Sequence, residues 1–214
     1  MEPPERIKAI TRLMREHYGD IDEGPREPRD PYRTLIGCVL SHRTRDENSS
    51  RASRNLFEEI EGPLDLLAMD QDTLKELIRC SGFYNQKARN IIAISQVLVD
   101  DFGGIVPEDR GTLMGLPGVG PKTADIVLSY AFGKPAIAVD VHVSRVARRL
   151  GLALGDAGPE RVKEALESLV PPDLYGFVDN AFVRQGKEYC RNSDPRCIGC
   201  FLHLLCTYPG SKSR

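Results

Sequence analysis

The sequence predicts an all-α protein, and two observations support this prediction. Apolar residues recur at spacings of three and four along nearly the whole chain, which is the period of a helix with one buried face. The alternation typical of strands is almost absent, and glycines and prolines divide the periodic stretches into short segments. We therefore expect about ten helices joined by short turns.

Five stretches carry the clearest helical pattern, in chain order. Their first and last anchoring residues are Ile7 and Tyr18, Ala52 and Ile60, Leu74 and Ile78, Ala88 and Leu98, and Val143 and Leu150. The last of them follows Ala136–Val139, the one segment that reads as extended, and Asp140 between them is a good N-cap residue. The Pro-rich segment Gly24–Pro31 is the best candidate for a hinge after the first helix.

The composition is that of a globular protein that can bury a core by itself. The chain has 214 residues, of which 41% are hydrophobic and 28% charged, so collagen-like and disordered classes are excluded. A monomer is therefore sufficient. Charged residues interrupt every apolar run before the length of a membrane span, and the first ten residues do not resemble a secretory signal, so we expect no membrane association and a cytoplasmic location.

The formal net charge of −2 conceals an uneven distribution. Residues 58–76 hold seven acidic residues and one lysine, whereas residues 79–95 hold three basic residues and no acid, and residues 111–151 hold five basic and two acidic residues. Each run on its own is explained by a solvated helix face. Together, the acid-poor stretches also fit a surface that faces phosphate groups.

The string LPGVGPKTA at residues 116–124 is the strongest local motif. Gly118 and Gly120 permit backbone angles closed to other residues, and Pro121 suits the first position of a helix. The backbone N–H groups of such a turn, together with the positive end of a helix dipole, form a seat for a phosphate oxygen. Gly118, Val119, Gly120 and Thr123 are therefore the candidates for phosphate contacts.

Four of the six cysteines lie within 17 residues near the C-terminus. Their pattern is Cys190-x6-Cys197-x2-Cys200-x5-Cys206, and four thiolates so spaced can enclose one metal centre. Only the central pair has the spacing of a zinc knuckle, which disfavours zinc without excluding it. Cys38 and Cys80 lie in apolar patterns and are expected to be small buried hydrophobes.

Taken together, these motifs resemble the endonuclease III family of DNA base-excision glycosylases over nearly the whole chain. The resemblance rests on LPGVGPKTA, on VDVHVSRV at residues 139–146, on DPYRTLIGCVLSHRTRDENS, on GFYNQKARNI, on VPEDRGTL and on the four clustered cysteines. It implies a helix-hairpin-helix at about residues 111–133, duplex DNA as the partner, and a 4Fe-4S cluster held by Cys190, Cys197, Cys200 and Cys206.

The resemblance also implies two helical lobes with a DNA cleft between them. One lobe would span residues 25–134, and the other residues 1–24 with 135–214, including the iron–sulfur loop at 190–206. Lys122 and Asp140 would then face each other across the cleft. The cluster would order a basic loop that includes Arg191 against DNA.

The resemblance places Lys122 as the nucleophile and Asp140 as its acidic partner. An amine attacks the sugar C1′ only when unprotonated, and the first turn of a helix favours that form. Attack leaves a Schiff base, from which β-elimination breaks the strand on the 3′ side. Residue type alone also allows Lys122 to be a phosphate-binding or solvated lysine, and Asp140 to be a plain N-cap.

Four further residues are candidates for contacts with the flipped nucleotide or its surroundings. Phe83 would be the wedge that fills the stack, or a packed helix end. Arg43 stands where many relatives have Gln, and its bidentate donors suit guanine. Asp46 would orient the base pocket or cap the next helix, and His142 would contact the DNA backbone or cap and pack.

The expected function is that of a bifunctional DNA glycosylase and abasic-site lyase acting on oxidised pyrimidines. One alternative is a mismatch glycosylase that removes thymine or uracil opposite guanine, although such relatives tend to lack the lysine. The other is a non-catalytic DNA-binding module with a structural metal, against which the presence of both Lys122 and Asp140 argues.

Overall fold

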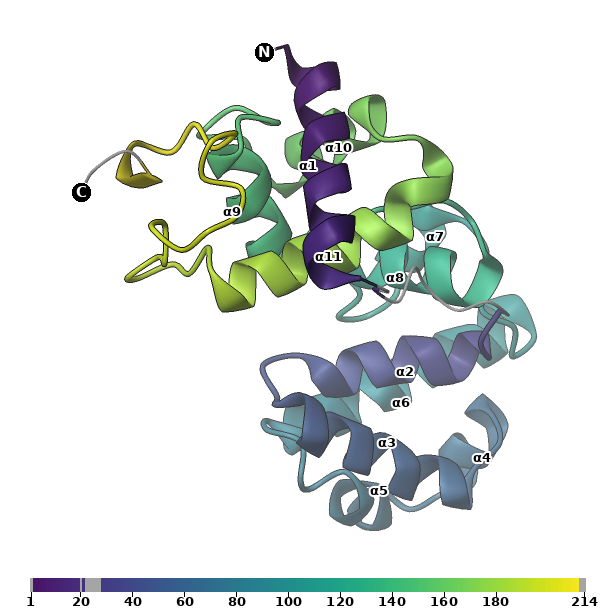
Figure 1. The fold of residues 1–214 in the computed structure, drawn as a ribbon. Coiled ribbons are helices and arrows are strands. Elements are labelled where there is room, and N and C mark those ends of the chain that lie inside the picture. The colour runs from purple at the N-terminus through teal and green to yellow at the C-terminus, as the bar shows by residue number, and fades with distance from the viewer. Residues whose placement is uncertain (1, 20, 22–27, 212–214) are drawn as a thin grey trace. The chain divides into compact units, whose positions relative to one another are not determined.

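A computed structural model describes residues 2–19, 21 and 28–211, and all regular secondary structure in this part of the chain is helical. It contains eleven α-helices and two short 3-10 helices, and no strand among the described residues (Figure 1). The prediction of an all-α protein is therefore confirmed, and the segment Ala136–Val139 has neither helical nor strand structure. Half of the predicted hinge, residues 24–27, lies outside the described residues.

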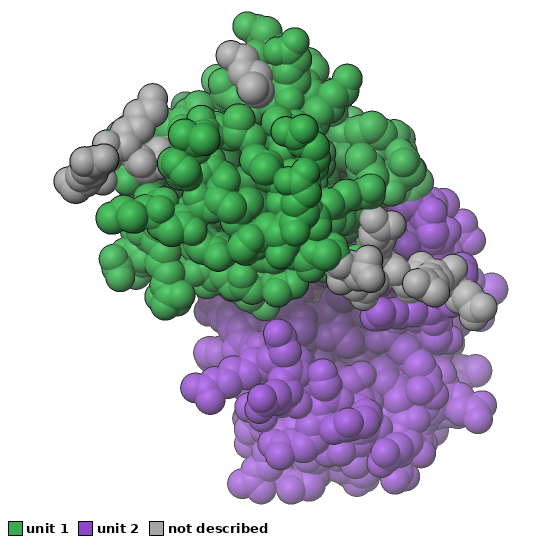
Figure 2. Space-filling view, viewed as in Figure 1, with its two compact units in different colours: residues 1–26, 135–214 green, residues 27–134 purple. Residues whose placement is uncertain are grey.

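The chain divides into two compact units, coloured separately in Figure 2. Unit 1 comprises residues 1–26 and 135–214, and unit 2 comprises residues 27–134. Among the described residues, unit 1 holds α1 (Pro3–Tyr18), α9 (Val141–Arg149), α10 (Pro159–Leu169), η1 (Pro172–Leu174), α11 (Tyr175–Glu188) and η2 (Pro209–Ser211). Unit 2 holds α2 (Pro31–Ser41), α3 (Asp46–Glu59), α4 (Pro63–Ala68), α5 (Gln71–Leu77), α6 (Tyr84–Phe102), α7 (Arg110–Gly115) and α8 (Pro121–Phe132). The roles expected for two lobes stay predictions.

Each unit has its own apolar core, built from the faces that the periodicity marks. In unit 1, Ile10 and Met14 of α1 are fully buried with Val143 and Val146 of α9. In unit 2, every helix contributes fully buried apolar side chains; they include Leu35, Ile36, Leu56, Leu66, Leu74, Ile91, Leu113 and Val127. Each such side chain contributes about 1.5–3 kcal/mol by leaving water.

Aspartates begin several of these helices by accepting hydrogen bonds from their first N–H groups. Asp30 accepts from Arg33 N at the start of α2, and Asp109 accepts from Thr112 N at the start of α7. Asp70 caps α5 by accepting from two backbone N–H groups. These caps satisfy donors that the helix cannot satisfy itself.

Two expectations about single residues need correction. Cys38 and Cys80 are each only partly buried, so they are not members of a closed core. Burial nevertheless raises the pKa of the Cys38 thiol to about 11, opposed by the positive charge of Lys122. Within the described part of the chain, no helix is long and apolar enough to cross a membrane.

A buried ion pair joins α7 to α8. Arg110 Nε lies 2.9 Å from Asp125 Oδ1, and Arg110 Nη2 lies 3.2 Å from Asp125 Oδ2, so the pair is bidentate. The Asp125 side chain is 2% exposed and that of Arg110 is 30% exposed. Removal of one partner from such a pair leaves a charge in a site of low polarity, which costs far more than an exposed pair contributes.

We expect Arg110→Ala to lower the free energy of unfolding of unit 2 by about 3 kcal/mol, because it removes the bidentate counter-ion of the buried Asp125 carboxylate. The exposed pair of Lys134 and Glu108 provides the control, and Lys134→Ala should cost less than about 1 kcal/mol. Urea denaturation followed by circular dichroism measures both. Equal, small losses for the two variants would show that the buried pair does not hold the two helices together.

Candidate functional site

The motif at residues 116–120 forms the turn between α7 and α8. Gly118 has φ +75°, and a Cβ placed there would lie 2.6 Å from Asn90 Nδ2, so glycine is needed at this position. Gly120 has φ −101°, an extended conformation open to other residues, so the expectation of special backbone angles is wrong there. Pro121 is the first residue of α8, as predicted.

The turn presents its backbone rather than its side chains. The side chains of Val119 and Thr123 are buried, at 6% and 2% exposed. Gly120 is the N-cap of α8, and no side chain caps this helix end. The N-terminus of α8 can therefore supply N–H donors to an anion.

Lys122 is exposed and is the second residue of α8. The next residue, Thr123, has its Oγ1 3.1 Å from His42 Nε2, a contact that joins α8 to the end of α2. Burial lowers the pKa of His42, and the positive charges of Lys87 and Lys122 lower it further. An exposed amine thus stands at the positive end of a helix, beside a histidine that favours its neutral form.

An open groove of about 430 Å³ runs between α2 and α8 within unit 2. Cys38 and Ser41 line it from α2, and Ile126 and Tyr130 line it from α8. Ile126 follows Lys122 by four residues, which places both on one face of α8. The groove is therefore on the same helix face as the candidate nucleophile.

Two turns of unit 2 each expose one side chain from a left-handed backbone. Arg43 has φ +51° in the turn between α2 and α3, and Phe83 has φ +58° at the N-cap of α6. The Phe83 side chain is 66% exposed, so it has the exposure that a wedge requires. A left-handed conformation at a non-glycine residue costs about 1–2 kcal/mol, and such strain concentrates at functional sites.

Asp46 does not cap α3. It is the first residue of that helix, whose N-cap is Arg45, and no side-chain bond caps this end. The alternative that Asp46 caps the helix is therefore wrong. The groove between α2 and α8 is not lined by Asp46, so its role at a base pocket stays a prediction.

In unit 1, Asp140 caps α9. Its Oδ1 accepts from His142 N at 2.7 Å and from Val143 N at 2.9 Å. The N-cap interpretation is confirmed, and its catalytic role stays a prediction. His142 packs against α11, because a Cβ on Gly186 would lie 2.7 Å from His142 Cβ. The Nδ1 atom of His142 lies 2.9 Å from Arg145 Nη2.

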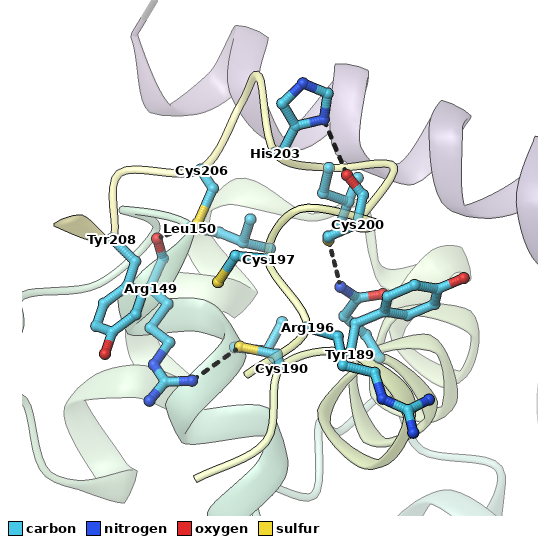
Figure 3. A pocket seen from close by; sticks show the side chains of 13 residues that line it. Arg149, Leu150, Tyr189, Cys190, Arg196, Cys197, Cys200, His203, Cys206 and Tyr208 are labelled. Carbon is cyan, nitrogen blue, oxygen red and sulfur yellow. Dashed lines mark hydrogen bonds between the residues drawn. The ribbon is translucent and has the colours of Figure 1, made fainter. Parts of the chain in front are cut away.

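The four clustered cysteines line one small pocket of about 30 Å³ in unit 1, seen from close by in Figure 3. Arg149 Nη1 lies 3.5 Å from Cys190 Sγ, and Gln185 Nε2 lies 3.1 Å from Cys200 Sγ. Within the described residues, no three histidine, cysteine or acidic side chains are placed to hold a single metal ion. A four-iron cluster, in which each cysteine binds a different iron, does not need the sulfur atoms so close together.

Arginines of α9 fasten the cysteine loop, and the sequence reasoning missed them. Arg145 Nε donates to Cys190 O at 2.7 Å, and Arg149 Nη1 donates to Arg191 O at 2.7 Å. The ring of Tyr208 lies 4.2 Å from the Arg149 guanidinium. The helix that begins at Asp140 is therefore bound to the cysteine loop at its other end. Their spacing of four residues was the only signal in the sequence.

The basic side chains near the cysteines are less available than the composition suggests. Arg184 pairs with Glu188 at 2.8 Å and stacks on the ring of Tyr18. Arg191 is partly buried, and its carbonyl accepts from Arg149. Contact of this loop with DNA stays a prediction.

A buried lysine, Lys87, is the second feature that sequence reasoning missed. It is 4% exposed, and its Nζ donates to Leu40 O and to Thr44 Oγ1, each at 2.6 Å. Burial lowers the pKa of Lys87 to about 8. In the sequence it counted only as one basic residue of an acid-poor stretch.

Comparison with known proteins agrees with this architecture. The family model of the HhH-GPD superfamily of base excision DNA repair proteins matches residues 36–172. The fold and the hairpin thus define a helix-hairpin-helix protein of base excision repair.

Within that superfamily, the chain belongs to the endonuclease III family. It is 46% identical to endonuclease III of Thermotoga maritima over 84% of each chain, and 35% identical to that of Escherichia coli K12 over 97% of each. A structure of a trapped covalent intermediate of endonuclease III with DNA is 36% identical, with a TM-score of 0.88 over all of both chains. A thermostable thymine-DNA glycosylase is 26% identical, with a TM-score of 0.78 over 95% of this chain.

The buried lysine predicts a pH dependence of stability. Its pKa is lowered in the folded protein, so the unfolded state binds more protons between about pH 8 and 10.5, and folding is favoured as the pH rises through this window. The stability difference between the wild type and Lys87→Met should shift towards the wild type from pH 7 to 10. His42 is the titratable group on which the charge of Lys87 acts, and it remains in the variant. Urea denaturation at each pH measures the difference, and a constant difference would contradict the assignment.

Proposed function

We propose that this protein is a bifunctional DNA glycosylase and abasic-site lyase that removes oxidised pyrimidines from duplex DNA. The observation that carries the proposal is the exposed Lys122 at the uncapped N-terminus of α8, in a chain of the endonuclease III family. A structural relative has been trapped as a covalent complex with DNA. Such a complex requires a nucleophile on the protein, and Lys122 is the candidate in this chain.

The reaction follows from an amine at this position. The Lys122 amine attacks C1′ of the flipped nucleotide, the N-glycosidic bond breaks, and the base leaves with its electron pair and a proton. The nitrogen then passes its second proton to the sugar O4′ as the C1′–O4′ bond breaks, and the C=N bond that forms makes the open sugar a Schiff base. The imine acidifies the C2′ proton, whose removal expels the 3′ phosphate, and water then releases the lysine. The Asp140 carboxylate would offset the positive charge that develops on the sugar.

The hairpin turn would hold the DNA strand through its backbone N–H groups. Val119 N already donates to Leu116 O, so the N–H groups of the two glycines and those at the start of α8 would be the donors to one phosphate group, and they carry no sequence preference. Extrusion of the target nucleotide leaves a gap in the duplex, and Phe83 would fill it while Arg43 contacts the base left behind. His142 and Arg191 would contribute backbone contacts from unit 1.

The substrate class is the finer part of the proposal. The groove along α2 and α8 offers the hydroxyl of Ser41 and apolar surface from Ile126 beside the nucleophile's helix face, which suits a flipped base. The alternative, a mismatch glycosylase, is favoured by Arg43, because an exposed guanidinium matches the edge of guanine. Base release is measured from a duplex with thymine glycol opposite adenine and from a duplex with thymine opposite guanine. The duplex that is processed faster distinguishes the oxidised-pyrimidine class from the mismatch class.

The cysteine pocket fits a resident 4Fe-4S cluster. Cys190, Cys197, Cys200 and Cys206 line it, and its N–H donors to sulfur come from Arg149 and Gln185, as thiolate ligands require. When bound, such a cluster would cross-link the loop and add no ligand site for the DNA reaction. The protein's residues around it fasten the loop to α9.

We place the protein in the cytoplasm as a monomer.

A borohydride trap tests the Schiff base. The wild type, incubated with duplex DNA that contains an abasic site and reduced with borohydride, should give a covalent adduct, and Lys122→Gln should give none. Lys134→Gln, a change just beyond the C-terminal end of α8, should trap as the wild type does. Asp140→Asn should slow trapping by about 100-fold, because the charge on the sugar is no longer offset. An adduct that persists in Lys122→Gln would reject this nucleophile.

The purified protein should be brown, with a broad absorbance near 400 nm, because clustered iron thiolates absorb there. Replacement of Cys197 by Ser should reduce the iron content and this absorbance, whereas Cys80→Ser should change neither. Iron and zinc are counted by elemental analysis. A colourless protein with one zinc would contradict the cluster.

A further inference from the structure

The two turns that expose Arg43 and Phe83 are fastened to each other by one hydroxyl group, that of Thr44. Gly82 N donates to Thr44 Oγ1 at 3.1 Å, although the two residues are 38 positions apart. A Cβ on Gly82 would lie 3.5 Å from both Arg43 O and Thr44 Oγ1, so the turns are in van der Waals contact. Arg43 directly precedes Thr44 in the chain and Phe83 directly follows Gly82, so both exposed side chains adjoin this junction.

The Thr44 hydroxyl uses its full hydrogen-bonding capacity. It accepts from Gly82 N and from Lys87 Nζ, and it donates to His42 O at 3.3 Å. A hydroxyl has one donor and two acceptor sites, and all three are used here within one turn. The first turn is therefore held in a single conformation in which Arg43 takes its left-handed backbone.

Lys87 holds this junction from below. It lies in the first turn of α6, directly after the turn of Phe83, and its Nζ bonds Leu40 O at the end of α2 as well as Thr44. Among the described residues its partners are a carbonyl and a hydroxyl, not a carboxylate. A buried ammonium without a counter-ion is costly, and an apolar residue would pack at lower cost. This cost indicates that the two hydrogen bonds of Lys87, and not the burial of its side chain, explain a lysine at this position.

The same turn reaches the nucleophile's helix. His42, which precedes Arg43, contacts Thr123 Oγ1, and Thr123 follows Lys122. The turn of residues 41–45 thus touches α8 at one end and the turn of Phe83 at the other. All of these contacts lie within unit 2.

We propose that Lys87 and Thr44 are positioning residues that lock the two DNA-probing turns together, so that Arg43 and Phe83 enter the duplex as one rigid device. This inference rests on the proposed function, because it assigns both side chains to the opening of duplex DNA. It adds that neither residue touches the reacting atoms. Their loss should impair reactions that need a nucleotide to be flipped and spare those that do not.

The test compares two probes, an abasic site in duplex DNA and the same abasic site in a single strand. Only in the duplex must the abasic sugar be turned out of the helix and the gap beside the opposite base be filled. Thr44→Val keeps the shape of the side chain and removes the hydroxyl, and we expect the single-turnover rate of borohydride trapping to fall about tenfold on the duplex. On the single strand the rate should stay within about twofold of the wild type.

Thr44→Ser is the matched control, because it keeps the hydroxyl, and it should retain the wild-type rate on both probes. Lys87→Met should reproduce the effect of Thr44→Val. If Lys87→Met fails to fold, as judged by circular dichroism, Thr44→Val decides alone, since Thr44 is only partly buried. A duplex with 2-aminopurine opposite the abasic site reports the displacement directly, and its fluorescence rise should be slower in Thr44→Val.

A double-mutant cycle with Phe83→Ala completes the test. If Thr44 acts through the wedge, the double variant should be little worse on the duplex than Phe83→Ala alone. Equal losses on both probes, unchanged rates in Thr44→Val, or fully additive effects would each overturn the proposal. The absence of an adduct with the wild type on either probe would instead reject the lyase activity, and this inference with it.

Discussion

Helix N-termini expose N–H groups that need acceptors, and this protein meets that need in two ways. At α2, α5 and α7 an aspartate supplies the acceptor: Asp30, Asp70 and Asp109 cap these three helices. No side chain caps the N-terminal ends of α3, α6 and α8. Asp46 and Lys122 lie in the first turns of α3 and α8, and Phe83 is the N-cap residue of α6. The donors there remain available to an outside anion, and the negative backbone of DNA is the acceptor that the proposed function provides. Helices α1, α10 and α11 also lack a side-chain cap, so an uncapped end marks a candidate role only where a candidate side chain stands beside it.

Asp140 is both a helix cap and a candidate catalytic carboxylate, and these two interpretations are compatible. Its Oδ1 atom alone accepts the two N–H groups at the start of α9. A carboxylate fixed in this way cannot rotate away, so the cap sets the direction in which the group can act on a substrate. At the far end of the same short helix, Arg149 binds the cysteine loop. Loosening that loop would thus disturb the helix on whose first turn the carboxylate depends.

The features that the sequence predicts well are those encoded by neighbours in the chain. The helical periods, Pro121 at a helix start, the cap at Asp140 and the left-handed Gly118 all depend on residues a few positions apart. The features it could not predict join distant positions. Lys87 and Thr44 are 43 residues apart, and Arg145 and Cys190 are 45 apart, and nothing in either segment names its partner. Gly120 shows the limit of local reasoning as well, because a glycine-rich motif identifies a turn without fixing which glycine carries the unusual angle. The pairing of Lys122 with Asp140 rests on the family resemblance and stays a prediction.

The small net charge of −2 is compatible with a DNA-binding protein, because backbone N–H groups can bind phosphate without adding formal charge. Salt-sensitive attraction by many lysines and arginines is one way to hold a phosphate backbone. A helix end that offers N–H groups is another, and it adds no formal charge. Here the acidic residues 58–76 lie on α3, α4 and α5 and in their connections, away in the sequence from the hairpin turn. Several basic residues are in turn occupied inside the protein: Arg110 by Asp125, Arg149 by the cysteine loop and Lys87 by backbone and hydroxyl oxygen atoms. The charge that composition counts is therefore a poor measure of the charge that DNA would meet, and in the proposed function backbone donors at α8 would supply part of the binding.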